Sequence, residues 1–188
     1  MAGLIELETE HLTLRQWREE DLLIYSKISS NPEVMKFFPK LLSLEESNRA
    51  AQKFKGLIAS RGWGFWAVEL KKTGKFIGYA GLHSPSTQFP FSPCVEIAWR
   101  VEPSYWENGY VLEAGETILS CAFDKLMLDE VVYFTALQNN RVQKLMNTLG
   151  MKDRNKPFSH PSFSDGNPFK EHRLYGLKRE EWISSFKH

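Results

Sequence analysis

The hydrophobic pattern changes its period several times along the chain, which indicates a mixture of strands and helices. Residues 6–15 alternate between apolar and polar side chains and predict a first strand. A short helix is predicted over 19–29, and it ends before Pro32 because the residue preceding a proline avoids the helical region. A second helix is predicted over 44–60, behind a capping-box pattern that begins at Ser43.

The rest of the chain predicts strands that alternate with two further helices. An apolar run over 131–137 has few polar interruptions and is typical of a strand buried on both faces. We expect one α/β domain over residues 1–188, with a mixed sheet. The remaining expected elements are strands over 63–70, 75–82, 94–101, near 151 and over 171–177, the longest helix over 107–127, a helix over 140–149, and a short polar tail.

Composition and charge narrow the class of protein. The 188 residues include 24 basic and 23 acidic side chains, with no basic run, which argues against sequence-independent binding of nucleic acid. Cys94 and Cys121 lack metal-ligand spacing and are expected to be free thiols in a reducing compartment, with no metal site. Neither an export signal nor a membrane-spanning apolar stretch is evident, so we expect a soluble, cytoplasmic protein without a membrane partner.

The segment over residues 95–114 is the most informative about chemistry. A strand there runs into a turn and then into a helix, and the first turn of a helix leaves several backbone N–H groups without partners. Such a turn favours a phosphate group, and Gly109 allows the backbone to approach a ligand closely. The spacing alone is weak evidence, because it matches neither the Walker nor the dinucleotide glycine pattern.

Five segments in order resemble the GNAT superfamily of N-acetyltransferases. The resemblance covers nearly the whole chain, and its closest branch is the RimJ/RimL-like one, which includes enzymes that acetylate the N-termini of ribosomal proteins. The matching segments are Glu8-Thr9-Glu10-His11-Leu12-Thr13-Leu14-Arg15, Gly74-Lys75-Phe76-Ile77-Gly78, Val95-Glu96-Ile97-Ala98-Trp99-Arg100-Val101, Trp106-Glu107-Asn108-Gly109-Tyr110-Val111-Leu112-Glu113-Ala114 and Asn139-Asn140-Arg141-Val142-Gln143-Lys144-Leu145-Met146-Asn147-Thr148-Leu149-Gly150-Met151.

The resemblance implies a fold and a cosubstrate. The fold is a mixed, mostly antiparallel sheet of seven strands that splays between strands four and five, flanked by about four helices. The cosubstrate is acetyl-CoA, whose pantetheine arm would bind the fourth strand as an added strand. The residues implied in coenzyme binding are Ile97, Trp99 and Val101 for the pantetheine arm, Trp106, Asn108, Gly109, Tyr110 and Val111 around the pyrophosphate, and Asn139.

The chain departs from the family pattern at positions that bear on catalysis. Val142 stands where a Ser is common, and Met146 stands where many members carry a Tyr that acts as general acid. The proton donor to the thiolate is therefore unassigned, and water could fill this role. Glu107 is unusual in a phosphate-binding loop, and we expect its side chain to point to solvent.

Acetyl transfer needs a neutral amine, so a base or a water path must remove a proton. Glu96 is the best candidate base, on the strand face that it shares with Ala98 and Arg100; the alternative is a solvent-facing carboxylate at a strand edge. His83, His160 and His172 are weaker candidates, because a lone histidine is more often structural. Tyr175 is expected to pack in the protein and not to act as an acid. Neither thiol has the setting of a nucleophile, so direct transfer is expected.

The acceptor pocket is expected to be aromatic. Its candidate residues are Phe38, Trp63, Trp66 and His83, together with Trp17 and Phe37, although ordinary core packing explains at least half of the aromatic residues as well. The acceptor is predicted to be a primary amine, either a protein N-terminus or a small molecule, and the enzyme a monomer or homodimer. A catalytically silent acyl-CoA-binding or sensor module on the same fold is the alternative, because the Tyr and Ser hydroxyls are missing.

Overall fold

The computed structural model describes residues 3–186, which form two compact units. The first unit contains the chain up to Leu82 together with Ala98–Ile118. The second contains His83–Ile97 and the chain from Leu119 onward. Strand β5 (Glu96–Val101) therefore begins in the second unit and ends in the first.

Antiparallel strands build the sheet of the first unit. Thr9 begins a tight turn, in which its N–H donates to the Leu12 carbonyl at 2.9 Å and its hydroxyl accepts from the Leu12 N–H at 2.9 Å. The single strand predicted over 6–15 is therefore wrong, because this turn folds the segment back on itself and pairs Leu7 with Leu14. The strands, each antiparallel to the next, are β1 (Leu7–Glu8), β2 (Leu12–Arg15), β3 (Phe65–Leu70) and β4 (Phe76–His83).

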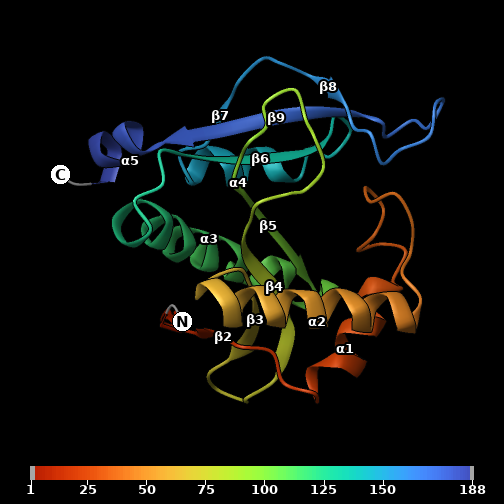
Figure 1. Cartoon of the computed structure of the whole chain (residues 1–188), viewed down its shortest axis with the longest axis vertical. Coiled ribbons are helices and arrows are strands. Elements are labelled where there is room, and N and C mark those ends of the chain that lie inside the picture. The colour runs from red at the N-terminus through yellow and green to blue at the C-terminus, as the bar shows by residue number, and fades with distance from the viewer. Residues whose placement is uncertain (1–2, 187–188) are drawn as a thin grey trace. The chain divides into compact units, whose positions relative to one another are not determined.

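Helices α1 (Asp21–Ser29) and α2 (Leu44–Arg61) pack together, and α2 crosses in front of β3 in Figure 1. The capping box predicted at the start of α2 is confirmed, because Ser43 accepts the Glu46 N–H at 3.1 Å and Glu46 accepts the Ser43 N–H at 2.9 Å. Gly62 ends the helix in the left-handed conformation that glycine adopts readily.

Aromatic side chains form the core between these helices and the sheet. Trp17 lies at its centre, with its ring in contact with those of Tyr25, Phe54 and Phe76 at centroid distances of 5.1, 5.9 and 5.4 Å. The indole N–H of Trp17 donates to the Phe65 carbonyl at 2.7 Å, so the buried polar atom is satisfied. This core accounts for part of the aromatic content of the sequence.

Two close backbone contacts bring β5 against β4 in the first unit. A Cβ atom at Gly78 would lie 2.1 Å from the carbonyl oxygen of Arg100, so only glycine permits this approach. Beyond the end of the strand, Glu102 N–H donates to the Ile77 carbonyl at 2.9 Å. The neighbouring strand thus fixes the position of Arg100.

The helical segment after β5 differs from the prediction. A single longest helix was expected over 107–127, but a 3₁₀-helix (Pro103–Asn108) comes first, and the left-handed Gly109 separates it from α3 (Tyr110–Ser120). A π-helical turn follows over Cys121–Lys125, in which Leu126 N–H donates to the Cys121 carbonyl at 2.9 Å. The longest helix is instead α2, with 18 residues against 11 in α3.

The second unit is built on a long antiparallel pair of strands. Strands β6 (Glu130–Ala136) and β9 (Glu171–Lys178) pair along the whole length of β6 and run side by side in Figure 1. The short strands β7 (Lys152–Asp153) and β8 (Phe158–Ser159) also pair with β9. The start of β5 is parallel to β6 and meets it in one register pair, Glu96 with Val132.

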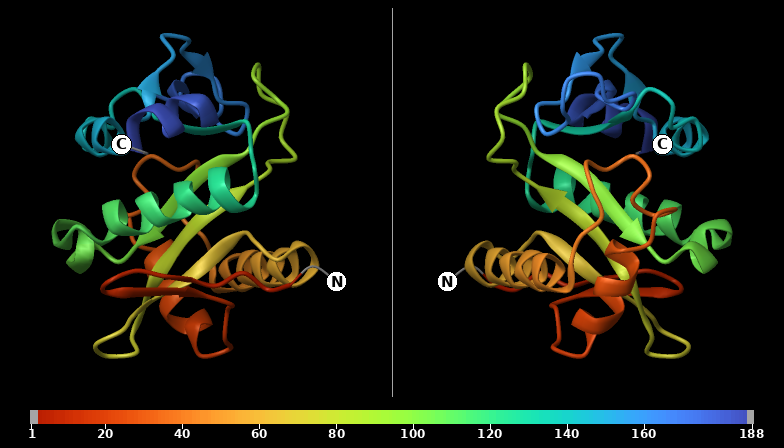
Figure 2. Two further views of the ribbon diagram at one scale, coloured as in Figure 1. Left: turned by 90° about the vertical axis from the view of Figure 1, so that its left-hand side faces the viewer. Right: turned by 90° about the vertical axis from the view of Figure 1, so that its right-hand side faces the viewer.

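A helix and a long loop complete this unit. Helix α4 (Val142–Thr148) follows β6, and α5 (Arg179–Phe186) lies where a polar tail was predicted. That prediction was wrong because Trp182 is buried and packs its ring on Phe123 at a centroid distance of 5.7 Å, a tertiary contact that stabilises a short polar helix. The connection from β4 to β5 is a long loop that Figure 2 shows in profile.

The predicted fold class is confirmed: the architecture is a mixed, mostly antiparallel α/β sheet with flanking helices. The described residues form nine strands and five α-helices, instead of the seven strands and about four helices expected, because short two-residue strands and α5 are added. Within residues 3–186, every helix is too short or too polar to cross a membrane.

Candidate active site

The turn after β5 presents backbone amides in the first unit. Gly109 has a φ of 76°, a left-handed conformation that favours glycine, and α3 begins at Tyr110. Glu113 is the first residue to bond back to this turn, through its N–H to the Gly109 carbonyl at 3.0 Å. The N–H groups of Tyr110, Val111 and Leu112 therefore precede the first helical hydrogen bond, as the predicted phosphate site requires.

Two side chains hold this turn in place. The indole N–H of Trp106 donates to the Val101 carbonyl at 2.8 Å, which ties the turn to the end of β5. Glu113 accepts from the backbone N–H of His11 at 2.7 Å and from its ring at 2.9 Å, and also from Thr9. Burial raises the pKa of Glu113, but these hydrogen bonds outweigh it, so the pKa is lowered and α3 is tied to the β1–β2 turn. Asn108 and Gly109 remain exposed.

Glu96 lies in the second unit, at the start of β5. Its side chain is partly buried, and burial raises its pKa from 4.5 to about 8. Among the described residues, no cation forms an ion pair with it, so nothing offsets the cost of removing its charge from water. A carboxylate with a pKa near the working pH can accept a proton from an ammonium group, as a general base must.

Asn139 is held at the end of β6 by a short chain of hydrogen bonds. Its side-chain amide donates to the Thr135 hydroxyl at 3.0 Å, and Thr135 is also hydrogen-bonded to the buried Tyr133. Burial raises the pKa of Tyr133, so the phenol keeps its proton. Thr135 and Tyr133 were not among the predicted site residues, although their alternation on a strand that leads to Asn139 is a signal present in the sequence.

The late histidines form a pair within an aromatic cluster. The rings of His160 and His172 have centroids 4.7 Å apart, and Phe158 and Phe163 contact both rings. Burial, reinforced by His172, lowers the pKa of His160 to about 4, and burial lowers that of His172. Both rings are therefore neutral at neutral pH. His83, the third histidine candidate, is partly buried at the end of β4.

A groove of about 730 Å³ opens in the second unit beside the register partner of Glu96. Its apolar lining includes Phe91, Cys94, Val132 and Leu174, while Arg154 is among the charged residues that also line it. Burial, with smaller effects of Glu96 and Glu130, raises the pKa of Cys94 to about 11, so this thiol is not activated as a nucleophile. Direct transfer, predicted from the sequence, is compatible with this chemistry.

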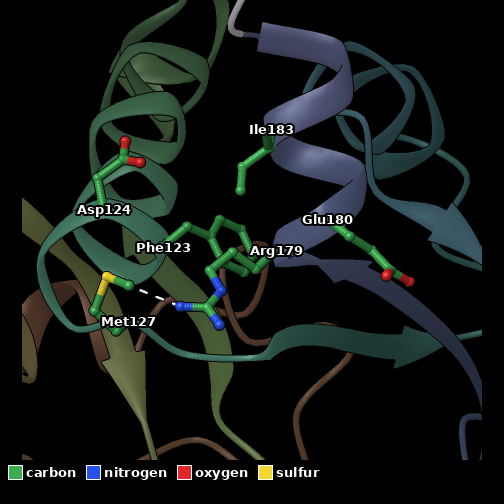
Figure 3. Close-up of a pocket in the computed structure, with 6 residues that line it drawn as sticks. All are labelled: Phe123, Asp124, Met127, Arg179, Glu180 and Ile183. Atoms are coloured by element: carbon green, nitrogen blue, oxygen red, sulfur yellow. Dashed lines mark hydrogen bonds between the residues drawn. The ribbon is translucent and has the colours of Figure 1, made fainter.

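A second hollow of about 510 Å³ lies between the π-helical turn and α5. Figure 3 shows the side chains that line it, among them Phe123 and Ile183, with Arg179 directed at the sulfur of Met127 at 3.9 Å. None of the predicted site residues lines this hollow.

The aromatic residues predicted for the acceptor pocket differ in burial. Trp66 is fully buried and donates its indole N–H to the Ile5 carbonyl at 2.8 Å, and Trp17 is a core residue, so core packing accounts for both. Phe38 and Trp63 are partly buried, and each carries an arginine on its ring, with guanidinium carbons 4.4 and 3.7 Å from the centroids.

The other predicted positions on β5, α4 and β9 are mostly buried. Ile97 and Val101 are buried, whereas Trp99 is partly exposed. Val142 and Met146 are buried on α4, and Tyr175 is buried with its ring 6.3 Å from that of Tyr133. Residues 3–186 hold no group of three or more His, Cys, Asp or Glu side chains that could bind a metal ion.

Comparisons with known proteins agree with this architecture. Residues 11–152 match the family model described as acetyltransferase (GNAT) domain. A curated relative, the uncharacterized N-acetyltransferase YnaD of Bacillus subtilis (strain 168), is 25% identical over 179 residues, covering 95% of this chain and 99% of its own.

Two solved structures show the same fold. One is a GNAT-family acetyltransferase from Bacillus anthracis, with a TM-score of 0.76, 20% identity, and coverage of 94% of this chain and 99% of that one. The other is a ribosomal-protein-S5-alanine acetyltransferase from Vibrio fischeri, with a TM-score of 0.74, 17% identity, and coverage of 95% and 98%.

Proposed function

Because the chain belongs to the GNAT acetyltransferase family and is an N-acetyltransferase, we propose that it moves the acetyl group of acetyl-CoA directly to a primary amine, with Glu96 as the base. The acceptor is a protein N-terminus or a small amine of the kind used by the RimJ/RimL-like branch. The likeness to the ribosomal-protein acetyltransferase fold supports that branch. The observation that carries the proposal is the unpaired, partly buried Glu96 with its raised pKa.

The acceptor nitrogen must lose two protons, one before and one after it attacks, and the sulfur of coenzyme A must gain one. Glu96 takes a proton from the ammonium group of the acceptor, and the neutral nitrogen attacks the thioester carbonyl carbon. The nitrogen, which becomes positively charged on attack, loses its second proton to water. The carbon–sulfur bond then breaks, and coenzyme A leaves as a thiolate that takes its proton from water. No tyrosine is required at the position of Met146, because a thiolate is a good leaving group near neutral pH.

Each residue predicted to bind the coenzyme has a role in this proposal. The amides around Asn108, Gly109, Tyr110 and Val111 bind the diphosphate, and Trp106 holds that turn. The backbone of β5 from Ile97, with Trp99 and Val101, binds the pantetheine arm as an added strand. Asn139 hydrogen-bonds to the coenzyme, oriented by Thr135. The cytoplasm, with its reduced thiols and acetyl-CoA, is the proposed compartment.

The test measures thiol release from acetyl-CoA with a panel of N-terminal peptides, polyamines and small amines, and identifies the product by mass spectrometry. Acetyl-CoA binding is measured in parallel by calorimetry. We expect binding and amine-dependent thiol release. Tight binding without turnover on any amine would favour a silent acyl-CoA-binding module, which the hydroxyl-free positions Val142 and Met146 keep open. Absence of binding would contradict both functions.

A further inference from the structure

Arg100 is a buried cation in the first unit, on β5. Its side chain belongs to a residue that is only 9% exposed, and one guanidinium nitrogen, Nη1, donates to the Tyr25 hydroxyl at 3.0 Å and to the Ser29 hydroxyl at 3.4 Å. The guanidinium carbon lies 4.4, 5.5 and 5.9 Å from the ring centroids of Phe38, Tyr79 and Tyr25. Three rings and two neutral hydroxyls thus form a box around this cation.

Residues 3–186 place no counter-charge in this box. Within the described residues no carboxylate forms an ion pair with Arg100, and its buried Nε has no hydrogen-bond partner. Buried guanidinium groups are normally paired with an anion, because removing the charge from water is costly. Contacts with aromatic faces offset part of this cost but leave the N–H donors unused.

The unused donors define what would complete the site. The Nε edge of a guanidinium, together with the adjacent terminal nitrogen, matches the two oxygens of a carboxylate. One cation and two neutral hydroxyls suit a singly charged anion better than a phosphate, which usually recruits more than one positive group. Phe38, which forms one wall of the box, is only partly buried and keeps some contact with solvent.

We propose that Arg100 binds a carboxylate carried by the amine acceptor, so that the preferred substrate is an amine that also bears a carboxylate group. This inference rests on the proposed function for the identity of the substrate, but Arg100 itself has no part in the transfer step. Tyr25 and Ser29 orient the guanidinium, while Phe38 and Tyr79 form the walls of the site.

The first experiment compares acceptors in matched pairs that differ only in a carboxylate or a carboxamide, such as phenylalanine with phenylalaninamide and short peptides with free or amidated ends. We expect kcat/KM to favour the acid of a pair about tenfold, which corresponds to about 1.4 kcal/mol. Arg100→Gln should abolish this preference, Arg100→Lys should retain part of it, and both should keep the wild-type KM for acetyl-CoA. Arg49→Gln removes an exposed charge of the same unit and should change nothing.

The second experiment does not depend on turnover or on the folding of a variant. Thermal unfolding of the wild-type protein is followed with 3-phenylpropionate and with 3-phenylpropionamide, and only the acid should raise the melting temperature. Equal effects of acid and amide, in turnover and in unfolding, would overturn the proposal. A preference for O-phosphoethanolamine over ethanolamine without any preference for carboxylates would also overturn it. Absence of thiol release with every amine contradicts the proposed function, and the unfolding comparison then still decides the role of Arg100.

Discussion

Strands β2 and β5 both carry ionisable side chains that are wholly or partly buried, but the two strands differ in whether these side chains have partners of opposite charge. Arg15 on β2 is 4% exposed and donates to both oxygens of Asp21 at 2.8 and 3.0 Å and to Glu69 at 2.7 Å. Arg100 and Glu96 on β5 have no partner of opposite charge among the described residues. Similar burial therefore leads to two different electrostatic outcomes.

The difference separates structural charge from functional charge. A buried ion pair with every donor satisfied holds two elements in register, here β2 with α1 and β3, and has nothing left to bind a ligand. A buried charge without a partner has a raised free energy that a substrate can lower, which is why perturbed groups gather at functional sites. This contrast agrees with our proposal that β5 binds ligands, whereas the paired charges of β2 support the scaffold.

The largest expected effect that tests this contrast is the fall in kcat when Glu96 is replaced. Glu96→Gln should lower kcat roughly 10²–10⁴-fold, the usual contribution of a general base, without unfolding the protein. The wild-type kcat/KM should rise with pH up to about 8, the pKa of Glu96, and then level off. The variant should not show this rise of kcat/KM with pH. Glu102→Gln, which removes a partly exposed carboxylate that pairs with Lys75 just beyond β5, is the control. An unchanged rate in Glu96→Gln would remove Glu96 as the base.

The next effect is on stability and concerns the two arginines. Arg15→Met leaves Asp21 and Glu69 without their cation, and should lower the free energy of unfolding by roughly 3–5 kcal/mol. Arg100→Met leaves no carboxylate without its cation and should change the free energy of unfolding by less than about 1 kcal/mol. Urea unfolding of both variants checks this difference. Equal losses would show that Arg100 is a structural residue like Arg15.

A smaller effect follows from the pH dependence of stability. Glu96 has a higher pKa in the folded protein, about 8, than its ordinary value of 4.5, so between these pH values the folded state binds more protons than the unfolded state. Its contribution to stability is therefore fully present below pH 4.5 and is lost as the pH rises toward 8. The melting temperature should fall between pH 5 and pH 9, and this fall should be smaller in Glu96→Gln than in the wild type. A parallel fall would contradict the raised pKa.

The smallest effect concerns the turn that follows β5. Gly109 and Gly74 both have positive φ values, 76° and 68°, and a Cβ atom would meet nothing within 4 Å at either position. Alanine at either position should cost roughly 1–2 kcal/mol of stability through backbone strain. Gly109→Ala alone should also raise the KM for acetyl-CoA roughly fivefold, which corresponds to about 1 kcal/mol. Equal KM values for the two variants would place the diphosphate elsewhere.

Local signals predicted the first half of the fold well. The capping box at Ser43 and the glycine at Gly62 set both ends of α2, because capping depends on residues within one turn of the helix. The β1–β2 turn escaped prediction, since alternation does not reveal where a strand folds back through a threonine. Helix α5 escaped as well, because burial of Trp182 against Phe123 joins residues far apart in the sequence.

In the candidate site, too, some features could be predicted from the sequence, whereas others depend on tertiary contacts. Glu96 and the Asn108–Val111 turn were identified from residue type, order and family resemblance. The raised pKa of Glu96 required its burial, which depends on how β6 and the surrounding loop pack. The aromatic box around Arg100 could not be predicted, because Tyr25, Ser29, Phe38 and Tyr79 come from three separate segments.

By itself the sequence determined the fold class, the family, the glycine-containing turn and the identity of the candidate base, because each of these depends on local pattern and on residue chemistry. Only the tertiary structure decided which charges are paired and which are not. The sequence around a strand arginine does not reveal whether its side chain meets Asp21 and Glu69 or is enclosed by three aromatic rings. The free-energy cost of removing its charge from water depends on these neighbours, which are distant in the sequence.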